Sequence, residues 1–283
     1  MLVIPHRLHC MNFKKITIFH DDKWKLSRSA IHEYIKILGY IRKTLSPKQK
    51  CFWHVSLTPS VNGLTTGSLF YNNKQFSINY NFFHSTFEIN YSNMQYEINI
   101  YGQSAESLYV ELEHLLNENQ INLNIDQSEF TCHPHPHYDE KTVIFFSEII
   151  SEVYNVIYKL KCNQSNETSP IQLWPHNFVL SMHWFSARGV CGHDTFNEKF
   201  SDEQINFGFS FGDITYPDPY FYITTSPSSE IFKSITLPSF AMWKNKSWQG
   251  IYIPYPSLSK LQNSKDSLLK FLNDVLTFGE NLM

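Results

Sequence analysis

Several motifs that would identify a catalytic function are missing from this sequence of 283 residues. It has no GxSxG nucleophile elbow, no Walker or dinucleotide-binding glycine motif and no HExxH zinc motif. Residue spacing also fails to pair a Ser or Cys nucleophile with an ordered base. The sequence therefore names no reaction, and it leaves open whether the protein is an enzyme.

Cysteines and charged residues are too scattered to indicate a special class of protein. The five cysteines include no CxxC pair, which argues against a disulfide framework and a zinc knuckle and favours a reducing cytoplasm. The formal net charge is -3 and no five like charges occur in a row, so we expect neither nucleic acid nor a membrane surface as a partner. No segment approaches the roughly 18 apolar residues of a membrane span, and the first residues lack a cleavage site for export. We expect a cytoplasmic protein without a cofactor.

Aromatic residues are abundant. They make up 16% of the chain, with 23 Phe and 16 Tyr, which is enough to line both a core and a pocket. Many lie in the block 173–226, which opens LWPHNFVLSMHWFSARG and closes NFGFSFGDITYPDPYFYITTSP. This block therefore holds most of the candidate functional residues.

Apolar periodicity in the first part of the chain predicts a helix, four strands and a second helix. From Ser27 to Leu45 the apolar residues recur at three- and four-residue steps, which is typical of an amphipathic helix. Residues 51–100 then alternate with period two, as the strands of an antiparallel meander do. Ser104 is placed to cap the second helix.

The second part of the chain predicts the same order of elements. Asp139 begins the longest helix, and Ser264 caps the last one. Between them we expect strands around residues 171–184, 206–211, 220–225 and 250–254. The fold class is therefore α+β, with two similar helix–four-strand–helix halves and mainly antiparallel sheets. FSINYNF in the first half and FGFSFGD in the second indicate either an internal duplication or a chance match between alternating strands.

The predicted domain organisation follows from this repeat. The expected segments are an irregular N-terminal arm at 1–22, a first α+β half at 23–125, a joint at 126–138 and a second α+β half at 139–283.

Three histidines in the joint form a weak metal candidate. His133, His135 and His137 alternate with proline, and imidazole suits zinc, copper or nickel. Proline imposes an extended geometry that does not fix a tetrahedral site. The simpler interpretation is a solvated linker after which Asp139 caps the long helix.

Two histidines lie in the expected strand around 171–184. His176 and His183 are seven residues apart, so they should point to opposite faces. His176 would share a face with Phe178 and Leu180, which favours a hydrogen-bonded core histidine over a ligand. A catalytic role for His176 would need a carboxylate partner, for which Asp213 is the candidate.

Other polar and aromatic candidates also have two interpretations. Asp213 follows Gly212, so it either projects into a cleft or accepts backbone hydrogen bonds in an Asx turn. Arg188 suits an anionic group or a surface ion pair. Trp243 and Trp248 either wall a pocket or cover a sheet edge.

The chain resembles the bacterial domain-of-unknown-function family five-nine-nine-six over most of its length. The residues that carry the resemblance are FWHVSL, GLTT, the HxxYD pattern at His135, Tyr138 and Asp139, LWPHNF, WFSAR, NFGFSFGD and PDPYFY. The resemblance implies no assigned activity. This chain has Val179 where relatives often have Asp, and Asn177 where they have a second His, so carboxylate chemistry at that point is not expected.

Three functions are compatible with these residues. The first is a small-molecule pocket, with polarity set by Arg188 or Asp213 and walls formed by Trp174, His176, Tyr220, Tyr222 and Trp243. The second is a hydrolase or metal-assisted enzyme that uses His176, Asp213 and His135. The third is a homodimer or protein-interaction module that uses exposed aromatic residues.

Overall fold

The structure is a computed structural model. It describes residues 12–14, 21–135, 138–190, 202–213, 215–228, 231–246 and 248–282. Contacts between residues divide the chain into two compact units, and each is described by itself. Unit 1 comprises Met1–Thr17, Asn155–Pro170 and Met182–Met283, and unit 2 comprises Ile18–Tyr154 and Ile171–Ser181.

Helix α1 (Asp22–Leu45) is the first element of unit 2. The Asp21 side chain caps it by accepting a hydrogen bond from the backbone N–H of Lys23 at 3.0 Å. The predicted apolar stripe is buried, including Ile31, Tyr34, Ile35, Leu38 and Ile41. The helix begins before the predicted Ser27 because Asp21 supplies the cap and Trp24 adds a further buried ring.

Residues 51–57 do not form the predicted strand. Most of them belong to a 3₁₀ segment, η1 (Lys50–Val55). The guanidinium group of Arg42 on α1 donates hydrogen bonds to the carbonyl groups of Trp53 and His54, at 3.5 and 3.1 Å. These carbonyls therefore face α1 and are bound by its arginine instead of by a neighbouring strand.

The first sheet lies entirely in unit 2. Its strands are β1 (Thr58–Ser60), β2 (Gly63–Thr65), β3 (Leu69–Tyr71), β4 (Lys74–Asn81), β5 (Thr86–Tyr91) and β6 (Met94–Asn99). Their order is β1-β2-β4-β5-β6, β3 also pairs with β4, and every pairing is antiparallel. The meander predicted for β4, β5 and β6 is confirmed.

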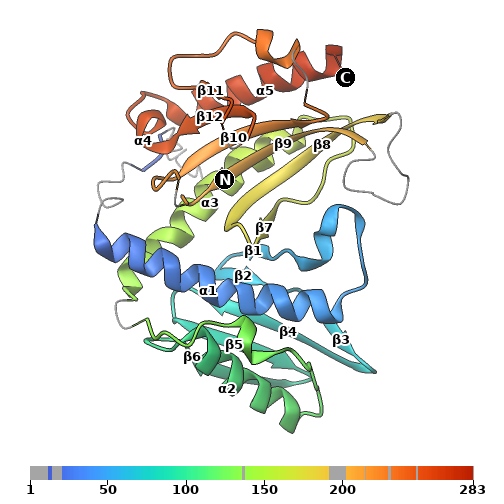
Figure 1. Cartoon of the computed structure of the whole chain (residues 1–283), viewed down its shortest axis with the longest axis vertical. Coiled ribbons are helices and arrows are strands. Elements are labelled where there is room, and N and C mark those ends of the chain that lie inside the picture. Colours follow the sequence, from blue (N-terminus) through green and yellow to red (C-terminus); the bar gives the residue numbers. More distant parts are fainter. Residues whose placement is uncertain are drawn as a thin grey trace, which may run out of the picture. The chain divides into compact units, whose positions relative to one another are not determined.

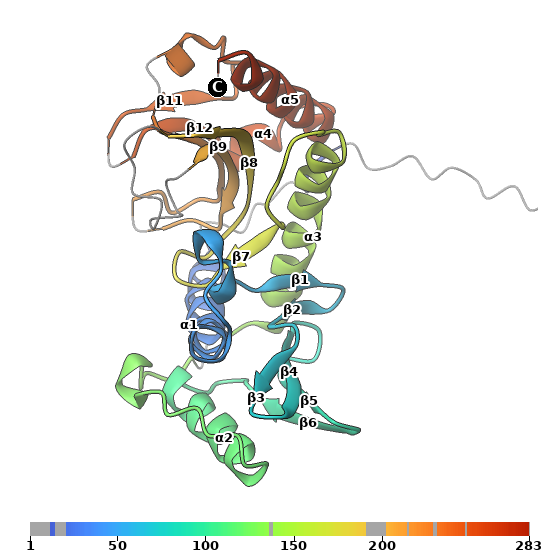
Figure 2. The same cartoon turned by 90° about the vertical axis from the view of Figure 1, so that its right-hand side faces the viewer.

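Two further helices follow the first sheet. The Ser104 side chain caps α2 (Ala105–Glu118) by accepting a hydrogen bond from the backbone N–H of Ser107 at 3.0 Å, as predicted. Figure 2 shows α1 and α2 on the same side of this sheet. A short 3₁₀ turn, η2 (Gln127–Glu129), precedes α3 (Glu140–Cys162), which is the predicted long helix.

The second sheet has the order β11-β12-β10-β9-β8-β7 (Figure 1). Its strands are β7 (Gln172–Trp174), β8 (Val179–Gly189), β9 (Asp202–Ser210), β10 (Tyr220–Ser226), β11 (Met242–Lys244) and β12 (Gly250–Pro254). β7 pairs with the first residues of β8 inside unit 2, and β9 to β12 pair antiparallel inside unit 1. The remaining elements of unit 1 are η3 (Ile231–Ser234), α4 (Tyr255–Leu258) and α5 (Ser264–Leu282).

One face of the second sheet forms the core of unit 1. Ile205, Phe207 and Phe209 of β9 are buried on this face, and Gly279 of α5 packs directly against Ile205. The alternate residues of β9 point to the opposite face, because strand side chains alternate with period two. That opposite face carries the polar and aromatic candidates.

Three residues of the predicted irregular arm are anchored to unit 1. Phe13 is buried, and its ring centroid lies 5.6 Å from that of Phe221 and 5.3 Å from that of Tyr255. Asn12 accepts a hydrogen bond from the backbone N–H of Ser264 at 3.1 Å, at the start of α5. Residues 1–11 and 15–20 of the arm lie outside the described residues.

The α+β class with antiparallel sheets is confirmed, and the helix–sheet–helix order occurs twice. Among the described residues each sheet has six strands, where four were predicted, because three-residue strands leave little pattern in a sequence. The strand orders differ, since β12 lies between β10 and β11 whereas β4, β5 and β6 are consecutive neighbours. The internal duplication and the joint at 126–138 stay predictions. Within the described ranges, no helix combines the length and the apolar character needed to cross a membrane.

Candidate functional site

Five aromatic rings gather on the polar face of the second sheet, within unit 1. We call the set Tyr216, Tyr220, Tyr222, Trp248 and Tyr252 the aromatic cluster. β10 places Tyr220 and Tyr222 on one face, and the strand register sets Tyr252 of β12 opposite Tyr222. The Tyr220 ring is central: its centroid lies 4.9 Å from that of Tyr252, 5.6 Å from Tyr216 and 6.4 Å from Trp248.

A glycine in β9 makes room for one of these rings. Gly208 lies opposite Tyr222 in the strand register, and a Cβ atom at position 208 would overlap the far end of the Tyr222 ring. Glycine in a strand often marks such a close approach. The NFGFSFGD segment therefore contributes the space that the far end of the Tyr222 ring occupies.

Asp213 is held by its own turn and by the aromatic cluster. One carboxylate oxygen accepts hydrogen bonds from the backbone N–H groups of Thr215 and Tyr216, both at 2.7 Å. The other oxygen accepts one from the Tyr220 hydroxyl at 3.0 Å. Burial is the main cause that raises the pKa of Tyr220, and the Asp213 carboxylate adds to it. The Asx-turn interpretation of Asp213 is therefore confirmed, and the residue also orients Tyr220.

A side-chain amide faces the same side of the sheet. Asn206 of β9 lies opposite Thr224 of β10, two residues from Gly208 on the same face. Its amide oxygen is buried and has no hydrogen-bond partner among the described residues. A buried acceptor left without a donor costs about 1–3 kcal/mol, so a donor that reached this oxygen would be bound favourably.

Lys244 covers part of the aromatic cluster. It lies on the edge strand β11, and its Nζ is 4.9 Å from the Tyr216 ring centroid and 4.8 Å from the Tyr252 ring centroid. Both distances are within the range of cation–π attraction. The sequence pattern did not suggest this residue, because contact between β11 and the turn before β10 depends on the strand order.

Trp243 and Arg188 do not join the aromatic cluster. Trp243 of β11 pairs with Ile251 of β12, and both side chains are on the core side of the sheet. The ring centroid of Trp243 lies 6.2 Å from the ring centroid of Phe232. Arg188 forms an ion pair with Glu203 at 3.5 Å, and more than half of its side chain is exposed. Of the seven predicted ligand-binding residues, the structure therefore brings together Asp213, Tyr220 and Tyr222.

The predicted strand around 171–184 is wrong in its middle, in unit 2. Residues 175–178 form a turn between β7 and β8, so alternation is interrupted: His176 is exposed, whereas Phe178 is buried. The shared face predicted for His176, Phe178 and Leu180 does not exist for this reason. The His176 carbonyl accepts a hydrogen bond from Nε2 of His32 on α1 at 3.1 Å.

The turn of the LWPHNF motif is docked on α1. Gly39 of α1 leaves space for Pro175, since a Cβ atom at position 39 would lie 2.8 Å from the proline ring. The His176 ring lies edge-on to Tyr40 with centroids 5.8 Å apart. Trp174 donates a hydrogen bond from Nε1 to the Ser181 hydroxyl at 2.9 Å. Trp174 and His176 belong to unit 2 and the other predicted ligand-binding residues to unit 1, so their convergence on one pocket stays a prediction.

Among the described residues, the structure adds no further metal ligand to the histidines of the predicted joint. His137 lies outside the described residues, and His133 is exposed. Nε2 of His135 is buried without a hydrogen-bond partner among the described residues, and its ring lies edge-on to Tyr34 with centroids 5.6 Å apart. In the part of the chain that is described, no three His, Cys, Asp or Glu residues group in a way that could hold a metal ion.

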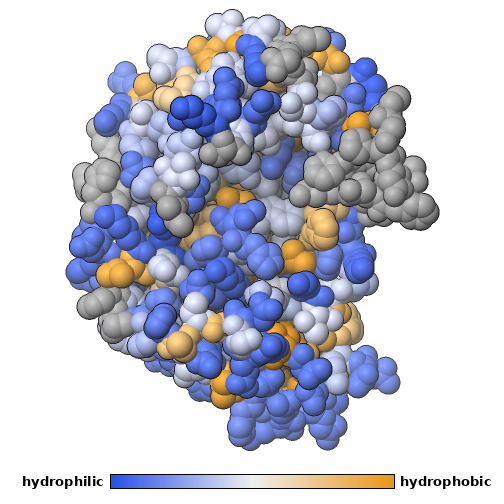
Figure 3. Space-filling model, in the orientation of Figure 1, coloured by the Kyte–Doolittle hydropathy of each residue, from blue (hydrophilic) through white to orange (hydrophobic). Residues whose placement is uncertain are grey.

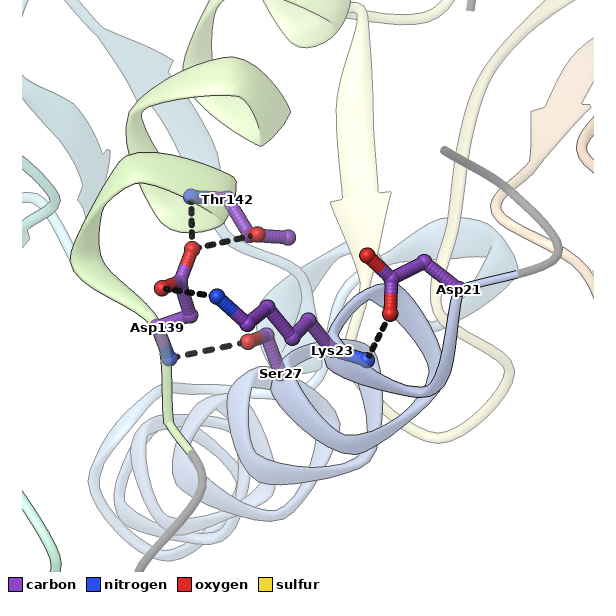
Figure 4. Close-up of polar contacts among 5 residues, drawn as sticks. All are labelled: Asp21, Lys23, Ser27, Asp139 and Thr142. Atoms are coloured by element: carbon purple, nitrogen blue, oxygen red, sulfur yellow. Dashed lines mark hydrogen bonds and ion pairs between the residues drawn. The ribbon is translucent and has the colours of Figure 1, made fainter. Parts of the chain in front are cut away.

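The Asp139 side chain caps α3, as predicted (Figure 4). It accepts hydrogen bonds from the backbone N–H and the hydroxyl of Thr142, at 2.9 and 2.7 Å, and its other oxygen lies 3.9 Å from Nζ of Lys23. The Thr142 hydroxyl is the largest cause that lowers the pKa of Asp139. The backbone N–H of Asp139 donates to the buried Ser27 hydroxyl at 3.0 Å. These bonds join the start of α3 to α1.

Tyr138 completes the HxxYD motif with a buried hydroxyl network. Its hydroxyl lies 3.0 Å from that of Tyr80 and donates to Ser85 at 3.2 Å. Beside it is a surface depression of about 520 Å³, lined by Tyr138 and Asp139 and by two lysines, Lys23 and Lys141. The motif is explained by structure alone, because its tyrosine and aspartate fasten α3 to the first sheet and to α1.

Exposed hydrophobic residues do not single out a partner surface. Phe52 and Phe70 in unit 2 are each more than half exposed. On the face drawn in Figure 3, hydrophobic residues form small separate areas within a largely hydrophilic surface. The homodimer interpretation stays a prediction.

Three histidines of unit 2 predict a loss of stability in mild acid. Burial is the main cause that lowers the pKa values of His32, His54 and His135 from 6.5. The unfolded chain therefore binds protons at higher pH than the folded chain does. The stability that the neutral histidines contribute is fully present above pH 6.5, the pKa of the unfolded chain. It declines as the pH falls from 6.5 toward the lower pKa values of the folded chain.

Urea unfolding at several pH values between about 8 and 5 measures this effect. The urea midpoint should fall below pH 6.5. His32→Phe keeps a ring against Phe178 and removes one titrating group, so its midpoint should depend less on pH. An unchanged wild-type midpoint across this range contradicts the prediction.

Comparison with known proteins supports the family resemblance. The sequence model described as "Family of unknown function (DUF5996)" matches residues 18–282. No curated protein and no solved structure matches the chain. The aromatic cluster and the residues that join the start of α3 to α1 both lie within the matched range.

Proposed function

We propose, from the premise that this chain belongs to the family of unknown function DUF5996, that it binds a small molecule at the aromatic cluster of unit 1. The observation that carries the proposal is that five aromatic rings share one face of the second sheet with Asn206, whose amide oxygen has no hydrogen-bond partner among the described residues. Small-molecule sites combine apolar and aromatic walls with a few polar groups in this way.

The burial of the rings supports this proposal. Tyr220 and Tyr252 are 6% and 8% exposed, so they form the base of the site, whereas Tyr216, Tyr222 and Trp248 are half-buried at its rim. The base is fixed by the hydrogen bond between Tyr220 and Asp213. A ligand therefore meets preorganised rings, which reduces the entropy lost on binding.

Asn206 gives the site a directional requirement. Its amide oxygen is buried without a hydrogen-bond partner among the described residues, so a ligand whose N–H or O–H donor reaches it, as the covering side chains shift, satisfies this acceptor. Sites that bind through such groups reject analogues that lack the donor.

A thermal-shift screen with three variants tests the proposal. A ligand should raise the unfolding temperature of the wild-type protein. Tyr222→Ala removes a rim ring, and Gly208→Ala displaces the same ring with little effect on the backbone, because only the far end of a flexible side chain must move. Both variants should lose about tenfold or more in affinity.

Trp243→Ala is the matched control, because it removes an aromatic side chain from the opposite face of the same sheet. It should lower stability and leave the affinity unchanged. Ligands that bind Tyr222→Ala and Gly208→Ala as tightly as the wild-type protein would show that they bind elsewhere.

The proposal includes a cytoplasmic location. Cys51, Cys132 and Cys162 are free, and Cys132 and Cys162 are exposed, which supports a reducing compartment. Asp213 is bound by its own turn and by Tyr220, so these contacts favour a role in orienting the cluster, and ligand binding is the function we propose.

A further inference from the structure

The aromatic cluster already holds a cation, which comes from the chain itself. Nζ of Lys244 lies 4.9 Å from the ring centroid of Tyr216 and 4.8 Å from that of Tyr252. An ammonium group attracted by two ring faces at this range makes two cation–π contacts. The two rings are 5.0 Å apart between centroids, so they share the one ammonium group.

Two carboxylates add negative potential at the same place. Burial is the main cause that raises the pKa of Tyr252 to about 12, and Asp218 and Asp213 are further causes. A negative potential that disfavours a tyrosinate also favours a bound cation. Asp213 is fixed by three hydrogen bonds, so its charge stays beside the rings.

Lys244 can leave this position without disturbing the sheet. β11 is the edge strand, and Lys244 pairs with Gly250 through its backbone. The lysine side chain is a flexible four-carbon stem, so it can turn into solvent while the ladder remains intact. An external cation can then occupy the same rings.

We propose that the aromatic cluster selects ligands that carry an ammonium or quaternary ammonium group, and that Lys244 occupies the cation position until such a ligand displaces it. This inference rests on the proposed function and specifies its ligand class. The ammonium group of the ligand lies over Tyr216 and Tyr252, and its hydrogen-bond donors lie on the side of Asn206. Quaternary ammonium groups are recognised in this way by aromatic rings in proteins.

Two probes of similar shape separate charge from size. Choline carries a quaternary ammonium group, and 3,3-dimethylbutan-1-ol is its neutral carbon analogue. Each is titrated into the full-length protein and followed by tryptophan fluorescence, because Trp248 belongs to the cluster. Choline should bind, and the neutral analogue should bind at least about fivefold more weakly.

Lys244→Met tests the role of the internal cation. Methionine keeps an unbranched stem and removes the ammonium group, so choline should bind about fivefold more tightly than to the wild-type protein. Lys246→Met removes the same charge from an exposed lysine two residues further along the chain and should leave choline affinity unchanged. Tyr216→Leu keeps an apolar side chain and should abolish the preference for choline over the neutral analogue.

The outcomes separate the two proposals. Equal affinity for both probes overturns the ligand class and leaves the binding function standing. An unchanged choline affinity in both Lys244→Met and Tyr216→Leu places choline elsewhere and overturns the inference. No choline binding to Lys244→Met at about 10 mM also overturns it. Only a screen in which every ligand binds Tyr222→Ala and Gly208→Ala as tightly as the wild-type protein overturns the binding function.

Discussion

Replacement of Trp24 by alanine should lower the free energy of unfolding by about 3–5 kcal/mol, the range for a fully buried tryptophan. Trp24 is 0% exposed. Its ring is stacked on Phe146 of α3, with centroids 3.9 Å apart and an interplanar angle of 5°, and it lies edge-on to Phe145. Alanine would leave a cavity that these rings cannot fill without moving α3.

Urea unfolding followed by circular dichroism measures the loss. Leu26→Ala is the control, because Leu26 lies in the same turn of α1 and its side chain is 43% exposed. That variant should change stability by about 0.5 kcal/mol or less. A loss of less than about 1 kcal/mol for Trp24→Ala would mean that the contact between α1 and α3 contributes little.

Replacement of Gly63 by alanine should have an effect of similar size, about 3 kcal/mol or more, or prevent folding. Gly63 begins β2 with φ 154°, and an added Cβ atom would overlap the backbone carbonyl oxygen of Tyr80 in β4. Backbone atoms of a central strand pair cannot move aside as a side chain can. The ladder between β2 and β4 would therefore have to separate at this point.

Gly102→Ala is the matched control. Gly102 also has a positive φ, 72°, but among the described residues no atom other than those of its chain neighbours lies within 4 Å of its added Cβ. Alanine at this position should cost about 1–2 kcal/mol, from the left-handed backbone alone. Equal losses for the two variants in urea unfolding would show that the overlap with Tyr80 does not decide the effect.

The sequence predicted the helices well because their signals are local. Ser104 and Asp139 were identified as caps from their positions next to apolar repeats, and both side chains accept the expected hydrogen bonds. The predicted start of α1 at Ser27 was too late, because Trp24 is an isolated aromatic residue within a polar stretch of the sequence. Its burial is visible only after α3 has been placed against α1.

Strand predictions failed where long-range contacts override alternation. The segment 51–57 alternates like a strand, but Arg42 binds its carbonyl groups, and also that of Thr66 in the GLTT motif. The segment 171–184 alternates too, but residues 175–178 turn to dock on α1. In both cases the segment that departs from the strand pattern contacts α1.

The features of the candidate site also fall into those that local sequence patterns predict and those that depend on long-range contacts. The sequence by itself determined that Tyr220 and Tyr222 lie two residues apart in one strand and that the chain is an α+β protein, and it offered the Asx turn as one of two interpretations of Asp213, because side-chain period and turn chemistry are local properties. Only the tertiary structure decided that Lys244 covers Tyr216 and Tyr252 and that Trp243 points to the core. The reason is the order β11-β12-β10-β9, since strand order sets which side chains become neighbours and no local pattern encodes it.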